Sequence, residues 1–193
     1  MDPHNAALLR LFARYATLSV SAQAAITHAA EYFSCRPNDI IFKEGKRDDH
    51  EYFLLEGIAG RGVTNDEGDT ITTGIYAAPV VVIPHFARTA RNTAIMTMQA
   101  LTPCVFGRIP VSVFDQLRLS YTDIGLVGQQ VVNNELADSI AAETTFRSST
   151  AKQRLQQLRE RLPDIESLIP HHVIASYLGI TPVSFSRLRA DHI

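Results

Sequence analysis

A series of short β-prone segments between residues 32 and 109 constrains the fold of this chain most strongly. Each segment is rich in β-branched and aromatic residues, and turn-forming residues separate it from the next. The predicted strands cover residues 40–42, 52–55, 58–63, 70–76, 80–83, 94–101 and 104–109. This spacing is typical of an all-β sandwich or roll.

Turn residues show how neighbouring strands pair. The segment Asn65-Asp66-Glu67-Gly68-Asp69 lies between two strand-like runs and offers a glycine for a position with positive φ. Gly45 and Gly57 close the neighbouring strands in the same way. A hairpin joins antiparallel strands, so we expect an antiparallel roll.

Helical patterns flank the β segment. Residues 5–30 predict two short helices, with Ser19 or Ser21 as the N-cap of the second. After Pro110 the β pattern ends, and a helical pattern without proline continues from about residue 123 to residue 146. We therefore expect a long helix after the roll.

Aliphatic residues form a stripe along this long helix. About 24 helical residues span roughly 36 Å, which is longer than a small domain needs for its own core. Two interpretations stay open: the stripe packs on the roll of its own chain, or it pairs with its twin across a two-fold axis. Gly125 and Gly128 weaken the helix prediction near its start. The stripe, our candidate dimer interface, consists of Ile124, Val127, Val131, Leu136 and Ile140.

Residues 170–189 have the pattern helix, tight turn, helix. Ala175 is small where a second helix must cross closely, and Gly179 supplies the positive φ of the turn. Thr181 is a good N-cap, with Pro182 at the first position of the second helix. This pattern is typical of a helix-turn-helix whose second helix enters the major groove of DNA, although a purely structural helical hairpin favours the same residues.

Charge is distributed unevenly along the chain. The formal net charge of −2 lacks the basic excess that would by itself indicate nucleic-acid binding. Up to Phe146, however, 16 acidic residues stand against 11 basic ones, whereas from Arg147 onward seven basic residues stand against four acidic ones. The net charge is thus −5 on the β-rich part and +3 on the helical end, which mildly supports DNA binding there.

The two cysteines and the lack of long apolar runs limit cofactors and location. Cys35 and Cys104 cannot supply all the ligands of a four-thiolate zinc site or of an iron–sulfur cluster, so we expect two free thiols and no cofactor. No run of about 18 apolar residues occurs. The chain opens with Asp2 and His4 instead of a signal peptide. We therefore expect a cytoplasmic protein.

Taken together, these elements resemble the Crp/Fnr family of bacterial transcription regulators over nearly the whole chain. In the roll the resemblance rests on residues 42–45 (FKEG), 52–57 (YFLLEG) and 65–69. At the C-terminal end it rests on residues 174–182 (IASYLGITP) and 186–189 (SRLR), which are similar to Bacteroidetes-type regulators. It implies an α+β chain with an antiparallel double-stranded β-helix of the jelly-roll, cNMP-binding-like type, a long dimerisation helix and a small all-α helix-turn-helix domain lacking a wing.

The resemblance also implies domains, partners and a role. We expect an effector-sensing β-roll with N-terminal helices at 1–118, a connecting helix at 119–147 and a DNA-binding domain at 148–193. The implied partners are double-stranded DNA and a second copy of the chain. A small-molecule effector and RNA polymerase are further candidates. The chain is then a dimeric regulator and not an enzyme.

The roll departs from the pattern of the family members that bind cyclic nucleotides. Those members hold the ribose and cyclic phosphate with a Gly-Glu pair and a following arginine. Residues 78–86 contain no Gly-Glu, and Ala94 stands where the arginine is expected. Without these partners nothing offsets the desolvation of a phosphate, so we expect no binding of cAMP or cGMP in the usual manner. Arg88 and Arg91 could hold another anion, or could simply be solvated loop arginines.

For DNA recognition, Arg187 matches a base-contacting arginine of the family. Such an arginine binds guanine O6 and N7. Pro182 and Val183 occupy two other reading positions and cannot donate hydrogen bonds, which predicts a different target sequence. His171 and Arg189 are candidates for phosphate contacts, with simple exposure as the alternative. The full set of candidate DNA-binding residues is Arg187, Ser184, Val183, Thr181, His171 and Arg189.

Two other functions remain as alternatives. The chain could be a ligand-dead family member that acts as a protein-interaction module, with its pocket closed by Val80, Val81 and Val82. It could also be a metal protein of the cupin type, but His50 and His85 stand alone in the β segment. No Ser-His-Asp or Cys-His arrangement is readable, so we assign no catalytic residue.

Overall fold

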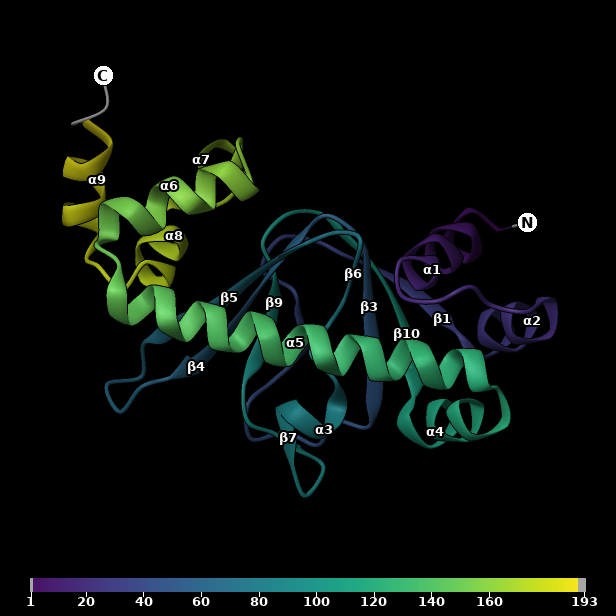
Figure 1. Cartoon of the computed structure of the whole chain (residues 1–193). Helices are drawn as coiled ribbons and strands as arrows, with labels where there is room; N and C mark the ends of the chain where they lie inside the picture. Colours follow the sequence, from purple (N-terminus) through teal and green to yellow (C-terminus); the bar gives the residue numbers. More distant parts are fainter. Residues whose placement is uncertain (1, 191–193) are drawn as a thin grey trace.

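The computed structural model describes residues 2–190. Two N-terminal helices precede ten short strands, and helices follow to the C-terminal end (Figure 1). The helices are α1 Pro3–Ala13, α2 Val20–Ala29, α3 His85–Arg88, α4 Val111–Ser120, α5 Thr122–Ser148, α6 Ala151–Arg161, α7 Ile165–Leu168, α8 His171–Tyr177 and α9 Pro182–Ala190. The strands are β1 Glu31–Cys35, β2 Ile40–Phe42, β3 His50–Glu56, β4 Ile58–Thr64, β5 Thr70–Ala77, β6 Val80–Val81, β7 Thr89–Ala90, β8 Thr93–Ala94, β9 Thr97–Ala100 and β10 Cys104–Pro110.

The strands form two antiparallel four-stranded sheets that face each other. Their strand orders are β1-β10-β3-β6 and β2-β9-β4-β5, and β7 and β8 form a small separate ribbon. Asn65 N donates to Asp69 O at 3.0 Å, which closes the predicted hairpin between β4 and β5. The predicted roll and its antiparallel pairing are confirmed.

One predicted strand, residues 94–101, is wrong as a single element. The structure divides it into β8 and β9, because Ile95 N donates to Arg88 O at 3.0 Å instead of joining the sheet. The chain bends away from the roll at this point to contact α3.

Three clusters of buried side chains hold the molecule together. The first joins α1, α2, α4 and α5 to the outer face of β3 through residues such as Phe12, Phe53 and Phe114. The second fills the space between the two sheets. The third joins Ile58 and Ile75 of the roll to the C-terminal helices. The C-terminal helices therefore pack directly on the roll.

Helix α5 crosses the roll and continues beyond it (Figure 1). The threonines and serines near its end remain helical, because Ser148 Oγ donates to Thr144 O at 2.8 Å. Arg147 also pairs with Glu143 one turn earlier at 3.0 Å. The helix consequently ends at Ser148, and the next helix starts at the predicted cap, Thr150, with a complete capping box.

The aliphatic residues of α5 lie on two different faces. Ile124, Val127 and Val131 are at most 8% exposed and pack in the first cluster of their own chain. They cannot line an interface between two copies, so the structure contradicts that part of the predicted stripe. Leu136 and Ile140 are 61% and 59% exposed.

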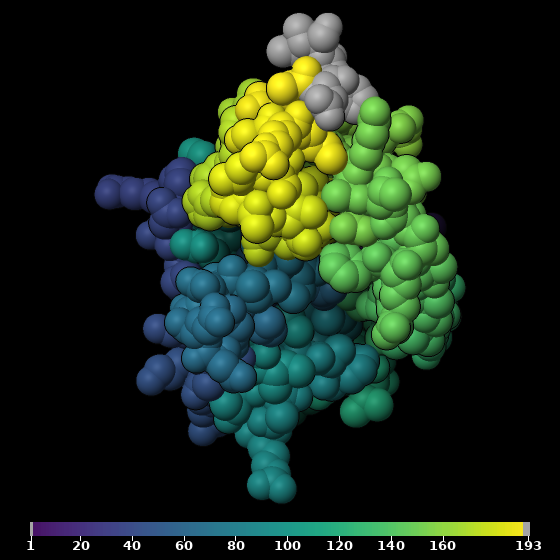
Figure 2. Space-filling view, turned by 90° about the vertical axis from the view of Figure 1, so that its left-hand side faces the viewer, coloured from purple at the N-terminus to yellow at the C-terminus, as the bar shows by residue number. Residues whose placement is uncertain are grey.

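The C-terminal helices form a compact unit at one end of the molecule (Figure 2). Helix α8 lies against β5, where Thr72 N donates to Ser176 Oγ at 2.9 Å. Helix α9 lies on the outside of this end. No helix within residues 2–190 has the length and hydropathy that a membrane span requires.

Candidate nucleic-acid interface and sensor domain

The pair α8 and α9 has the geometry of a helix-turn-helix. Gly179 adopts φ +69° between the two helices, and Ile180 N donates to Ala175 O at 3.0 Å across the turn. Ile174, Ala175 and Phe185 are at most 1% exposed and fill the angle between the helices. The predicted positive φ at Gly179 and the close crossing at Ala175 are confirmed.

The start of α9 is capped from within the helix. Thr181 Oγ1 accepts a hydrogen bond from Ser184 N at 3.1 Å and lies 3.0 Å from Ser184 Oγ. The structure therefore assigns Thr181 the capping role. Its hydroxyl is already engaged by the first turn.

The outer face of α9 presents three of the predicted contact residues. Val183 is 61% exposed, and Ser184 and Arg187 are also exposed. Arg187 follows Ser184 by three residues and Val183 by four, so the three side chains lie on the same side of the helix. Among residues 2–190, no ion pair involves Arg187. The Arg187 side chain is thus available on the exposed surface of α9.

His171 and Arg189 are held within the domain. Arg189 Nε donates to Glu166 Oε2 at 2.7 Å, and Arg159 pairs with the other oxygen of the same carboxylate at 2.6 Å. His171 Nε2 lies 3.1 Å from Glu166 O. Arg189 thus shares the single Glu166 carboxylate with Arg159, and a phosphate contact by Arg189 or His171 stays a prediction. These two side chains fasten α8 and α9 to α7.

The end of α5 contacts the turn of the helix-turn-helix. A side chain at Gly179 would place its Cβ 2.8 Å from the Phe146 ring, so this contact requires glycine. The Arg154 guanidinium lies 4.7 Å from the same ring and donates to Leu178 O at 2.7 Å and to Ser149 O at 2.5 Å. The end of α5 therefore packs directly against the turn between α8 and α9.

Aromatic and aliphatic side chains fill the interior of the roll. Tyr52, Phe42, Met98 and Phe106 are at most 6% exposed in this cluster. Ala94, at the position of the expected phosphate-binding arginine, is 2% exposed and belongs to the same packing. Between the two sheets this chain therefore has a packed core.

Arg88 lies inside this core. It is fully buried, forms an ion pair with Asp48, and donates to Ile83 O at 3.0 Å and to His50 O. Its guanidinium lies 4.5 Å from the centroid of the Phe42 ring. Burial lowers the pKa of Arg88 to about 9. The predicted effector contact is wrong for Arg88, because its guanidinium group already pairs with Asp48. The alternative of a solvated loop arginine is also wrong, because the side chain is fully buried.

Arg91 is placed differently. It lies at the exposed turn between β7 and β8 with φ +52°. The interior of the roll is on the other side of this ribbon. Its position agrees with a solvated loop arginine.

Comparison with known proteins relates these features to a known fold. Residues 32–121 match the model of the cyclic nucleotide-binding domain. The global regulator CLP of Xanthomonas campestris, described as c-di-GMP responsive, aligns over 90% of this chain and 93% of its own, with 13% identity and a TM-score of 0.71. The chain has the Crp/Fnr fold. No curated protein matches its sequence.

Two further solved structures show the same Crp/Fnr arrangement. A protein of Eubacterium rectale assigned to the Crp/Fnr family covers 90% of this chain and 83% of its own, with 16% identity and a TM-score of 0.70. FixK2 of Bradyrhizobium japonicum covers 84% and 83%, with the same identity and TM-score. A wing hairpin after Arg189 was not expected, and the positions beyond residue 190 lie outside the described residues.

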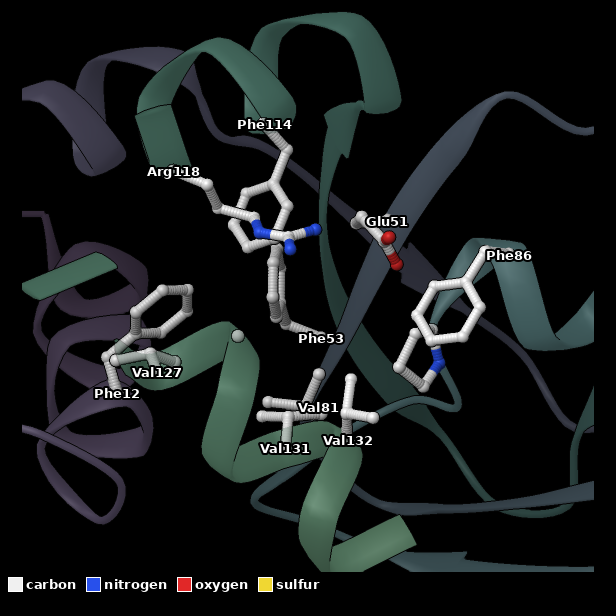
Figure 3. A pocket seen from close by; sticks show the side chains of 12 residues that line it. Phe12, Glu51, Phe53, Val81, Phe86, Phe114, Arg118, Val127, Val131 and Val132 are labelled. Carbon is white, nitrogen blue, oxygen red and sulfur yellow. The ribbon is translucent and has the colours of Figure 1, made fainter. Parts of the chain in front are cut away.

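This Crp/Fnr fold contains a crevice that the sequence reasoning missed. It lies outside the roll, between β3, α4 and α5, and its polar lining consists of Glu51 and Arg118 (Figure 3). A charged residue within the apolar run of β3 was the available indication. Within residues 2–190, no group of three or more His, Cys, Asp or Glu side chains could hold a metal ion.

Proposed function

We propose that this chain is a dimeric DNA-binding transcription regulator with a sensor domain that does not bind cAMP or cGMP in the usual way. The observation that carries the proposal is the exposed face of α9, which presents Val183, Ser184 and Arg187 on a helix-turn-helix at the end of a Crp/Fnr fold. A helix of this kind fits the major groove, where arginine binds guanine in a bidentate manner.

Dimerisation is supported by the outer face of α5. Leu126, Leu136 and Ile140 are 53%, 61% and 59% exposed, and Leu126 and Ile140 are two heptads apart. Exposed aliphatic residues at this spacing are typical of a helix that pairs with another helix. The inner face of α5 already packs on the roll, so its outer face is the one that can meet a second copy.

The packed interior of the roll supports the statement about nucleotides. A cyclic phosphate between the sheets would have to displace several buried aromatic rings and would find no unpaired cation, because Asp48 already pairs with Arg88. Overpacking and desolvation would both oppose such binding.

The test of DNA binding is selection from randomised duplexes, followed by fluorescence anisotropy at two salt concentrations. We expect a two-fold symmetric site with half-sites about one helical turn apart. Arg187→Ala should weaken binding to that site by about 1–3 kcal/mol and relax its sequence preference. The control Arg108→Ala removes an arginine on β10 that pairs with Glu31, far from α9, and should leave binding unchanged. Binding without sequence preference would contradict the proposal.

The test of dimerisation is sedimentation equilibrium of Ile140→Glu. Two glutamates facing each other in an apolar seam repel, so we expect a monomer. Leu119→Glu is the control, because Leu119 is 89% exposed on α4 and lies outside the α5 stripe. A dimer that survives Ile140→Glu unchanged would exclude the outer face of α5 as the interface.

A further inference from the structure

The crevice outside the roll combines an apolar wall with two separate polar groups. Figure 3 shows its space bordered by the rings of Phe53, Phe86 and Phe114, with Arg118 and Glu51 at one side. Val131 of α5 forms part of the opposite wall. Apolar surroundings with a few convergent polar groups are the usual form of a small-molecule site.

The crevice is small and has a movable edge. Its cavity volume is about 20 Å³, which is room for about one water molecule, so a ligand enters only when a wall of the crevice moves. Phe86 forms one border, is 62% exposed and belongs to the four-residue helix α3. Rotation of this ring is the simplest way to admit a ligand.

Arg118 enters the crevice because α5 leaves room for it. A Cβ atom at Gly128 would lie 3.1 Å from Arg118 Nε, so the side chain lies directly against the helix backbone. Its ion-pair partner within residues 2–190 is Asp115, with Nη1 and Oδ1 3.4 Å apart. An arginine has five N–H donors, so several remain available for an anion.

Glu51 provides a second hydrogen-bonding group. It is 8% exposed, and both of its carboxyl oxygens accept from His85 N, at 3.2 and 3.0 Å. Burial is the main reason that the pKa of Glu51 is raised to about 7; the hydrogen bond from His85 N lowers the pKa, Asp115 raises it and Arg118 lowers it. Near neutral pH a protonated Glu51 can donate a hydrogen bond to an anion beside it.

We propose that this crevice binds a short-chain monocarboxylate, whose carboxylate pairs with Arg118 beside Glu51 and whose apolar chain contacts Phe53, Phe114 and Val131. A single cation in an apolar crevice suits a monoanion, because a phosphate dianion would lose more hydration than one arginine replaces. An amine would meet the positive charge of Arg118. A neutral alcohol would offer no negative charge to the guanidinium donors that Asp115 leaves open.

The occupied crevice would connect the sensor to the DNA-binding end. Its walls come from β3, α4 and the α5 residues Val127 to Val132, and Phe146 near the end of α5 contacts the turn of the helix-turn-helix. A ligand that pushes on α5 therefore acts on the helix that carries both the exposed residues Leu126, Leu136 and Ile140 and the contact of Phe146 with the turn. This regulatory meaning rests on the proposed function, whereas binding of the carboxylate does not.

Isothermal titration of the full chain without DNA tests the inference. The probes are sodium butyrate, sodium benzoate, butanol, butylamine and inorganic phosphate. We expect saturable binding of butyrate and none of the other four, because the benzoate ring is too bulky for a crevice of this size. Arg118→Gln should weaken carboxylate binding at least about tenfold, the loss expected for one charge-assisted hydrogen bond. Arg108→Gln, which removes an arginine of the roll with similar exposure, should leave binding unchanged.

Each outcome of this titration decides the matter. Equal binding by the Arg118→Gln and wild-type proteins would overturn the inference, as would equal binding of butanol and butyrate, or the absence of saturable butyrate binding. Thermal unfolding of Arg118→Gln controls for folding, and Gly128→Ala, which displaces the Arg118 side chain, provides a second variant. Because no DNA is present, failure here leaves the DNA-binding proposal standing, and failure of DNA binding leaves this result standing.

Discussion

The interior of the roll and the crevice outside it each contain one acid and one arginine, but the two pairs are arranged in opposite ways. In the interior, Asp48 and Arg88 form an ion pair and are 2% and 0% exposed in their side chains. In the crevice, no ion pair joins Glu51 to Arg118 among the described residues, and a small cavity lies beside them. Asp48 and Arg88 are part of a packed core, whereas Glu51 and Arg118 line a cavity.

This difference shows that pairing and packing close the interior of the roll, whereas the crevice outside it keeps hydrogen-bonding groups beside open space. A buried pair that neutralises itself offers nothing to a ligand, and removing one partner strands the other charge. Two groups held apart retain hydrogen-bonding capacity. Strand β3 lies between the two regions, since Tyr52 faces the interior and Glu51 and Phe53 face the crevice.

The largest effect should come from breaking the interior pair. Arg88→Met leaves the Asp48 carboxylate buried without its cation, so we expect the free energy of unfolding to fall by about 3–5 kcal/mol. Urea denaturation measures this free energy of unfolding. The matched change in the crevice, Arg118→Met, should cost less than about 1 kcal/mol, because that side chain is 40% exposed. Equal losses in the two variants would remove the contrast between the regions.

Glu51 should make stability depend on pH. Burial raises the pKa of Glu51 from 4.5 to about 7, so the folded chain binds this proton more tightly than the unfolded chain does. The resulting stabilisation is complete below pH 4.5 and is lost as pH rises through 7, by about 3 kcal/mol at pH 8. Glu51→Gln removes this loss. Urea denaturation at pH 4.5 and at pH 8 gives the free energy of unfolding of the wild type and of the variant. The difference between the two proteins should change by about 3 kcal/mol between these pH values. A difference that stays constant would mean that the pKa of Glu51 is the same in the folded and unfolded chains.

Gly128→Ala should separate stability from binding in the crevice. Replacing a helical glycine with alanine stabilises α5 by about 0.5–1 kcal/mol. The new methyl group displaces the Arg118 side chain, so carboxylate binding should weaken while the melting temperature rises slightly. Asn134→Ala, on an exposed part of α5 outside the crevice, is the control that should leave binding unchanged. If the Gly128→Ala variant binds the carboxylate as tightly as the wild type, the present position of the Arg118 side chain is not required for binding.

The smallest effect is expected for Tyr52→Phe. The Tyr52 hydroxyl donates to Asp48 Oδ1 at 3.4 Å, a long hydrogen bond beside the ion pair. Its removal should reduce the free energy of unfolding by less than about 1 kcal/mol, measured by the same urea denaturation. A loss near that of Arg88→Met would show that Asp48 depends on both partners.

Local patterns predicted most of the fold. The strands followed from β-branched runs separated by turn residues, and the hairpin at residues 65–69 followed from its asparagine and glycine. The helix-turn-helix followed from Ala175, Gly179 and Thr181, whose roles depend on neighbours within a few residues. These features could be predicted because the residues that determine them are adjacent in the chain.

The list of aliphatic residues in α5 was not enough to predict which face of the helix each of them occupies. Val131 and Leu136 are five residues apart, which turns the helix by about 140° beyond a full turn. The apolar stripe therefore moves from the roll side to the solvent side between them, and one predicted interface proved to be two surfaces. Counting this angle would have separated Leu136 and Ile140 from the three buried residues.

The charged pairs could not be predicted, because their members are distant in the sequence. Forty positions separate Asp48 from Arg88, and 67 separate Glu51 from Arg118. No local pattern brings either pair together. Only the packing of α3, α4 and α5 around β3 does so.

The most direct test of the account is amide NMR of the full chain, titrated separately with sodium butyrate and with cAMP. The account predicts that butyrate shifts the amide signals of Glu51, Arg118 and residues 127–132, and that cAMP shifts no amides of the roll interior. Shifts produced by cAMP around Gly45, Tyr52 and Ala94, with none produced by butyrate in the crevice, would contradict it.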